Sequence, residues 1–215
     1  MKLRLLAGLL LIAATPLGAQ QDIAARLAGR VSPEVAARVQ RLAADAAARG
    51  LPAEPLIQKA IEGSAKGVAA ERVVLAVQGV VAQLEAAADA LRAAGLTPPD
   101  TDAIAAGAFA LNAGLRGKDI ADLARASGGS YGVAVTLRVA GTLAALGVPA
   151  AETVELVTAT IRAGRQTADL LTLPGQVQGA VGRGATPAQA AAGLTRAAAA
   201  RANAPGQGRP KPPHP

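Results

Sequence analysis

One short segment holds a cluster of charged side chains that could bind a ligand or a partner. The segment GLPAEPLIQKAIEGSAKGVAAERV, residues 50–73, contains a cluster of charged residues: Lys59, Glu62, Lys66, Glu71 and Arg72. The candidates for partner binding are Lys59, Glu62, Lys66 and Arg72. Glu62 precedes Lys66 by four residues, so the two side chains meet on one face of a helix. Such a cluster would form a charged surface for a protein partner or an anionic ligand. The competing interpretation is a solvated helix face with ordinary ion pairs, each worth about 0.3–0.5 kcal/mol.

Four acidic residues supply oxygens that a cation could use: Asp100, Asp102, Asp119 and Asp122. They lack the ordered Asp-x-Asp-x-Asp-Gly loop and the distal Glu of a calcium-binding hand. Each lies near the start of a predicted helix, where a carboxylate accepts hydrogen bonds from free backbone N–H groups. We therefore expect these acids to cap helices, and the sequence predicts no metal and no cofactor.

Missing residue types remove most enzymatic mechanisms. The chain has no Cys, and its one His is His214, next to the last residue. Thiolate nucleophiles, zinc ribbons, iron–sulfur sites and His-based triads therefore lack their residues. We expect a protein that is not an enzyme. The remaining enzymatic alternative is a hydrolase resembling a glycosidase, which needs two acids about 5–9.5 Å apart. Its candidates are Glu62, Glu71, Asp100, Asp102 and Asp122.

One glycine-rich loop could hold a phosphate through its backbone N–H groups. Residues 127–132 read SGGSYG, without the following Lys of a P-loop or the spacing of a dinucleotide site. We expect an interhelical turn in which Ser130 caps the next helix. Tyr131 and Phe109 are the only aromatic residues, and we expect both to pack against the fold.

The first 19 residues have the features of a secretory signal peptide. Lys2 and Arg4 precede an apolar run, Pro16 follows it, and Ala19 offers a small residue for cleavage. The apolar run of about 10 residues is shorter than the ~20 that span a bilayer. We expect cleavage after Ala19 and a periplasmic or secreted bacterial protein; an uncleaved N-terminal anchor is the alternative.

The rest of the chain reads as all-α, because apolar residues recur at helical spacing and no stretch alternates as a half-buried strand does. Glycines followed by an apolar or long residue, and soon by Pro, Thr or an acid, predict helix ends and the starts of the next helices. Ser32-Pro33-Glu34 and Thr186-Pro187 are the clearest starts. The predicted ends are Gly50, Gly67, Gly95, Gly114, Gly147, Gly164 and Gly184.

A long apolar stripe predicts one central helix over about residues 69–94, as a core helix or as the seam of a coiled-coil dimer. Around it we expect eight to ten short helices in one domain, residues 20–200. Glycine spacings near 17–20 residues are compatible with a short array of helical hairpins or with an irregular bundle.

Residues 201–215 are rich in Pro and Gly and cannot continue a helix, so we expect a disordered basic tail. No acid follows Asp169, and the basic residues near this end could tether the protein to an anionic envelope polymer or lipid surface: Arg196, Arg201, Arg209 and Lys211. Nucleic acid is a poorer partner, because aromatic side chains for base stacking are nearly absent.

The segment GLPAEPLIQKAIEGSAKGV, residues 50–68, resembles uncharacterised secreted, alanine-rich helical proteins of bacteria. The resemblance implies a secreted address and a helical fold, and no activity. Together these features predict a non-enzymatic interaction or structural protein of the bacterial envelope that docks a protein partner through a helical surface. A tail-mediated tether and a carboxylate-only hydrolase are the alternatives.

Overall fold

The computed structural model describes residues 17–128, 131–164 and 166–203, with side chains from Asp22 onward, and these residues form ten helices and no strand. The all-α prediction is confirmed. The helices are α1 (Leu17–Leu27), α2 (Pro33–Ala48), α3 (Glu54–Ala65), α4 (Ala70–Ala93), α5 (Thr101–Asn112), α6 (Gly117–Ala126), α7 (Val133–Ala145), α8 (Ala150–Arg162), α9 (Thr167–Gly182) and α10 (Pro187–Ala202).

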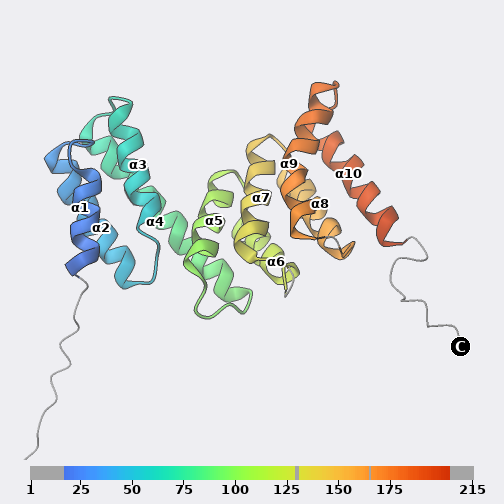
Figure 1. The fold of residues 1–215 in the computed structure, drawn as a ribbon, viewed down its shortest axis with the longest axis horizontal. Coiled ribbons are helices and arrows are strands. Elements are labelled where there is room, and N and C mark those ends of the chain that lie inside the picture. The colour runs from blue at the N-terminus through green and yellow to red at the C-terminus, as the bar shows by residue number, and fades with distance from the viewer. Residues whose placement is uncertain (1–16, 129–130, 165, 204–215) are drawn as a thin grey trace, which may run out of the picture.

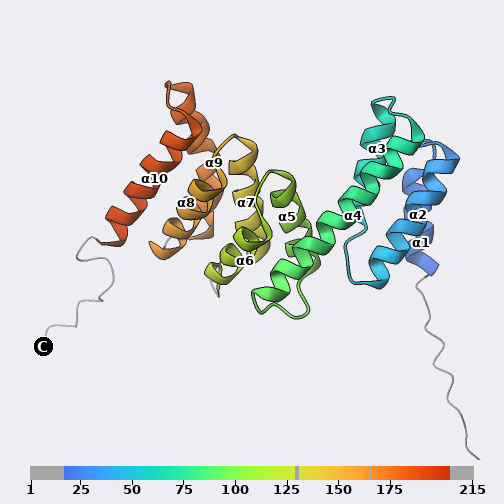
Figure 2. The same cartoon turned by 180° about the vertical axis from the view of Figure 1, so that it is seen from behind.

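The helices form an elongated array of two rows. Helix α2 packs against α4, α4 against α6, α6 against α8 and α8 against α10, while α5, α7 and α9 pack in the same way in the other row. Figure 1 shows α5, α7 and α9 side by side, and Figure 2 shows α4, α6, α8 and α10 following one another along the molecule. The structure is therefore a short array of helical hairpins, the first of the two arrangements that the sequence left open.

Helix α4 is the predicted long central helix, and it connects α2 and α3 with α5 and α6. Its 24 residues pack against α2 and α3 on one side and against α5 and α6 on the other, and the helix runs obliquely between these groups (Figure 1). The predicted stripe is buried at Val73, Val77, Leu84 and Leu91. Among the described helices, α4 alone is long and apolar enough to cross a membrane, and here it is a core helix.

Glycine ends the helices as the sequence predicts. All seven predicted glycines have positive φ, and Gly29 is an eighth that the sequence analysis missed. At the end of α7, Gly147 has φ 87°. Its N–H donates to the carbonyl of Ala144 at 2.9 Å, and the N–H of Val148 reaches Leu143 at 3.1 Å. Val148 then buries its side chain against the core. This is a Schellman turn, in which a left-handed residue closes the helix and its apolar successor folds back.

Side-chain caps open several helices. Ser32 caps α2, and Thr186 caps α10 by exchanging two hydrogen bonds with Gln189, at 3.2 and 3.0 Å. Both predicted starts are confirmed. The prediction for α7 is wrong, because its N-cap residue is Gly132; Gly129 and Ser130 lie outside the described residues.

Small residues let the helices of the array approach closely. A β-carbon on Gly141 of α7 would lie 2.6 Å from a ring carbon of Phe109 and 3.0 Å from the Cα of Ala110, both on α5. A β-carbon on Gly107 would lie 3.0 Å from the Cβ of Ala87 on α4. The alanine-rich composition thus produces a core with short interhelical distances rather than one filled with large side chains.

The ends of the described chain concern the predicted cleavage point, leader and tail. Helix α1 begins at Leu17, so the predicted cleavage point after Ala19 falls inside this helix. Helix α10 continues to Ala202, just into the predicted tail. Residues 1–16 of the leader and 204–215 of the tail, with Arg209, Lys211 and His214, lie outside the described residues.

Candidate functional site: a groove across three helices

The largest of the four grooves described here, about 770 Å³, crosses the face of the molecule formed by even-numbered helices. Helix α8 provides its floor, α6 one wall and α10 the other. Each helix contributes residues at helical spacing, so the lining is a set of three stripes. The lining residues are Asp122, Arg125, Ala126, Ala151, Val154, Glu155, Thr158, Ala159, Arg162, Thr195, Ala199, Ala202 and Asn203.

The amphipathic pattern of α8 creates the floor. Its core side carries Thr153, Leu156, Val157 and Thr160, all buried. The opposite side is turned to solvent between two neighbouring helices of the same row, and its floor residues recur at steps of three and four. Because most of them are Ala, Val or Thr, the floor stays low between its walls.

Charged side chains line the groove in two different states. On the α6 wall, Arg125 pairs with Asp122 at 2.6 Å and also donates to the carbonyl of Ala93 at 3.4 Å. On the floor, Glu155 and Arg162 are exposed, and neither forms an ion pair within the described part of the chain. The wall pair is therefore already neutralised, while the two floor charges are available to a partner.

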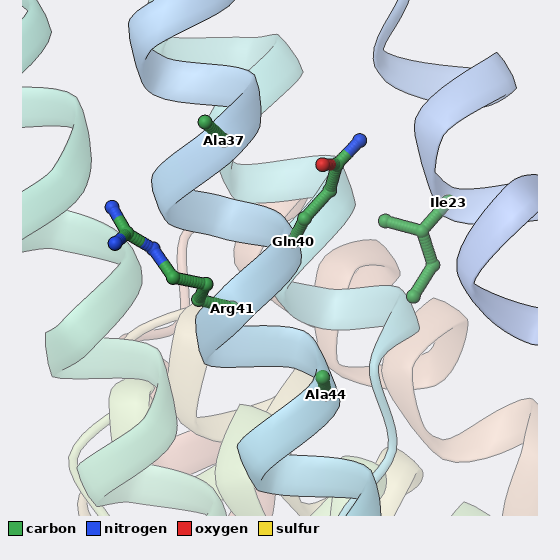
Figure 3. Close-up of a pocket in the computed structure, with 5 residues that line it drawn as sticks. All are labelled: Ile23, Ala37, Gln40, Arg41 and Ala44. Atoms are coloured by element: carbon green, nitrogen blue, oxygen red, sulfur yellow. The ribbon is translucent and has the colours of Figure 1, made fainter. Parts of the chain in front are cut away.

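The other grooves offer less chemistry. A groove of about 460 Å³ lies between α1 and α2, lined by Ile23, Ala37, Gln40, Arg41 and Ala44. Figure 3 shows Gln40 beside Ile23 and Arg41 pointing to the other side of α2. Grooves of about 620 Å³ between α9 and α10 and about 380 Å³ between α2 and α4 complete the set. Of these four grooves in the described residues, the α6–α8–α10 groove alone combines three helices with unpaired charges of both signs.

The predicted charged cluster lies on α3 and the start of α4, outside these grooves. Glu62 accepts from Lys66 and also pairs with Lys59 at 3.4 Å. The hydrogen bond from Lys66 has the largest effect on the pKa of Glu62, and the one from Lys59 the next largest. Both hold that pKa below its ordinary value. Arg72 is exposed, and it makes no ion pair with the other three in the described residues. The structure thus joins Lys59, Glu62 and Lys66, and their role in partner binding stays a prediction.

Two of the four predicted acids, Asp100 and Asp119, cap helices as expected, and Asp102 lies in the first turn of α5. Asp100 is the N-cap of α5 and accepts the N–H of Ala103 at 3.2 Å. Asp119 lies in the first turn of α6 and is 2% exposed. Burial alone raises its pKa, but hydrogen bonds from the Arg116 N–H and from the Lys118 and Arg116 side chains outweigh burial, so its net pKa is lowered. Asp122 departs from the prediction, because it pairs with Arg125 one turn later.

No described cluster of three Asp, Glu or His side chains could hold a metal ion. Of the five acids that a carboxylate-only hydrolase would use, the described grooves include only Asp122, which is held by Arg125. Phe109 packs against α7, where Arg138 lies 5.4 Å from the ring centre, and Tyr131 is buried.

Of the predicted tether residues, Arg196 and Arg201 lie exposed on α10. Glu155 and Arg162 were not predicted from the sequence, although a signal was present: they are seven residues apart on a helix bounded by two predicted glycine turns. Their significance depends on α6 and α10, whose nearness to α8 is not visible in the sequence.

Comparison with known proteins found no protein similar to this chain. No family model, curated protein or solved structure matches the chain.

Proposed function

We propose that this chain is a non-enzymatic interaction protein of the bacterial envelope, which docks a protein partner in the α6–α8–α10 groove. The observation that carries the proposal is the groove itself: a continuous surface built from three helices, with Glu155 and Arg162 unpaired among the described residues. An array of helical hairpins offers extended surfaces of this kind for partner binding.

The lining favours a macromolecular partner over a substrate. Small-molecule sites are concave and place a few convergent polar groups around the ligand. Here the lining residues are spread over three helices and are largely Ala, Val and Thr. A carboxylic general acid also needs a raised pKa. In the described residues the carboxyl groups with a shifted pKa are Glu54, Glu62 and Asp119, and each is shifted downward.

The envelope address rests on the predicted leader, and the fold is compatible with its removal. Cleavage after Ala19 would remove the first residues of α1 and leave the contacts that attach this helix. Ile23 and Leu27 are buried. Arg26 forms a two-pronged ion pair with Glu54 on α3, one contact being 2.7 Å long. A chain that starts at Gln20 therefore keeps these side chains of α1.

The exposed Arg196 and Arg201 on α10 support the alternative, an electrostatic tether. One co-sedimentation experiment with isolated cell-envelope material separates the two functions. It compares residues 20–215, a form ending at Asn203, which keeps every groove-lining residue, and the variants Ala199→Arg and Ala200→Arg, at low and high salt. Ala199 and Ala200 are both exposed on α10, and only Ala199 lines the groove. The two variants therefore add equal charge and differ in the groove alone.

We expect Ala199→Arg to stay in solution while Ala200→Arg and the shortened form pellet with the envelope. Treating the envelope with protease should abolish pelleting. If the shortened form stays soluble and Ala199→Arg pellets normally, the tether is correct and groove docking is wrong. A protein that never pellets contradicts both functions.

A further inference from the structure

We propose that the groove receives an α-helix of the partner, which lies along α8 and carries one basic and one acidic side chain two helical turns apart. This inference rests on the proposed function and names the chemistry of the docked segment. It follows from the shape of the groove, from the polar groups of its lining and from the positions of Glu155 and Arg162.

The dimensions fit a half-sunk helix. The floor runs from Ala151 to Arg162, which at ~1.5 Å per residue is about 16 Å long. A helix about 10 Å in diameter, sunk to half its depth over that length, displaces about 650 Å³. The groove volume is about 770 Å³. Three turns of helix therefore fill the groove, and the small floor residues leave room for larger apolar side chains of the partner.

The lining disfavours an extended peptide. An extended segment needs partners for its own N–H and C=O groups, which a helix satisfies internally. Three of the six floor residues, Ala151, Val154 and Ala159, offer only methyl groups. On the α10 wall, the Thr195 hydroxyl already donates to the carbonyl of Ala191 at 3.0 Å. A strand lying here would leave the backbone groups above these three residues without hydrogen-bond partners.

The two floor charges set the register of the docked helix. Glu155 and Arg162 are seven residues apart, about 10.5 Å along α8. Opposite charges placed over them on the partner would form two ion pairs, whereas like charges at either point would be repelled. Asp122 and Arg125 do not compete, since they pair with each other at 2.6 Å. A basic and an acidic residue seven positions apart on the partner helix match this spacing.

Three stapled 15-residue helices test the inference. They share one Leu/Ala sequence and differ only at two surface positions seven residues apart, which are Lys and Glu, Lys and Lys, or Glu and Glu. Each carries a fluorophore and is titrated into residues 20–215 at low salt. We expect the mixed-charge helix to bind about threefold to tenfold more tightly than the other two. Glu155→Lys should transfer that preference to the Glu/Glu helix.

The controls separate this inference from the proposed function. Ala199→Arg should weaken binding of the mixed-charge helix, and Ala200→Arg should not. If an unstapled version interrupted by proline binds equally well at the groove, the helical occupant is wrong while groove docking stands. Equal binding of the three stapled helices overturns the charge register. Binding that Ala199→Arg leaves unchanged lies elsewhere and contradicts both. Absence of any binding overturns the inference, and co-sedimentation then still reports on groove docking.

Discussion

Asp119 is a buried carboxylate whose role can be measured directly. It is 2% exposed and accepts the Arg116 N–H at 2.9 Å, together with contacts from the Arg116 and Lys118 side chains at 3.2 and 3.1 Å. Asp119→Ala leaves these donors without an acceptor. We expect a loss of about 1–2 kcal/mol in the free energy of unfolding by urea. Asp122→Ala, an exposed control, should change it by less than about 0.5 kcal/mol. Equal effects would contradict the role of Asp119 as a cap.

The lowered pKa of Asp119 makes part of the stability depend on pH. A carboxyl group whose pKa is lower in the folded chain stabilises the fold above its unfolded pKa, about 3.9 for Asp. That contribution is lost as the pH falls through the lower folded pKa. We therefore expect the stability difference between the natural chain and Asp119→Asn to be full at pH 7 and to narrow below about pH 4. Urea titrations across this range measure it; a difference that widens in acid has the wrong sign.

At the scale of residues, the sequence predicted what depends on near neighbours. Asp100 as a cap and the Glu62–Lys66 pair follow from spacings of three and four residues, and the structure has both. The prediction of Ser130 as a cap was wrong because residues 127–132 hold two Ser and three Gly, and several of them could begin α7. Glu155 and Arg162 were missed because an exposed charge acquires meaning only from helices that are distant in the sequence.

At the scale of elements, alanine substitutions at two helix-interior glycines should change the stability of the protein in opposite directions. A β-carbon at Gly141 would meet Phe109 and the backbone of Ala110, whereas one at Gly79 would meet nothing within 4 Å. Gly141→Ala should therefore destabilise the protein by about 1–3 kcal/mol through overpacking. Gly79→Ala should stabilise it by about 0.5–1 kcal/mol, because alanine favours the helix. Thermal unfolding of both variants tests the close contact between α5 and α7. A Gly141→Ala protein as stable as the natural chain would contradict the close contact between α5 and α7.

The helices themselves were predictable because their ends are signalled locally. A glycine with positive φ and its apolar successor close a helix within one turn, and Gly147-Val148 is an example. The long helix around Val77 and Leu84 was predicted for a similar reason, since its stripe persists over 24 residues. Gly29 was not predicted, although Arg30 follows it as Arg165 follows the predicted Gly164 and Ser32-Pro33 opens the next helix.

At the scale of the whole molecule, the array arrangement predicts that α9 and α10 can be removed without unfolding the remaining helices. Within the described structure, helices α9 and α10 make their main contacts with each other and with α7 and α8. A chain of residues 20–163 should keep its remaining helices, with less stability and an unchanged ellipticity per residue. Circular dichroism and urea unfolding measure this. Loss of most of the helical signal would indicate a single cooperative bundle instead.

The sequence left array and bundle open because the decisive contacts join each helix to the second one along the chain. Amphipathic stripes identify which side of a helix is buried, and they do not identify the neighbour. The groove between α6, α8 and α10 is a product of that stacking. For this reason the proposed docking surface could not be located before the structure, although an interaction role was already expected from the missing catalytic residues.

Site-directed crosslinking tests the central claim, that the groove docks a protein, most directly. Because the natural chain has no Cys, Ala159→Cys places a unique benzophenone label on the groove floor. Leu75→Cys places the same label on α4, at a position that is 64% exposed and outside the described grooves. After illumination with envelope material, we predict a discrete, protease-sensitive adduct from the label at 159 and none from the label at 75. Adducts of equal yield at both positions, or none at 159, would contradict docking in the groove.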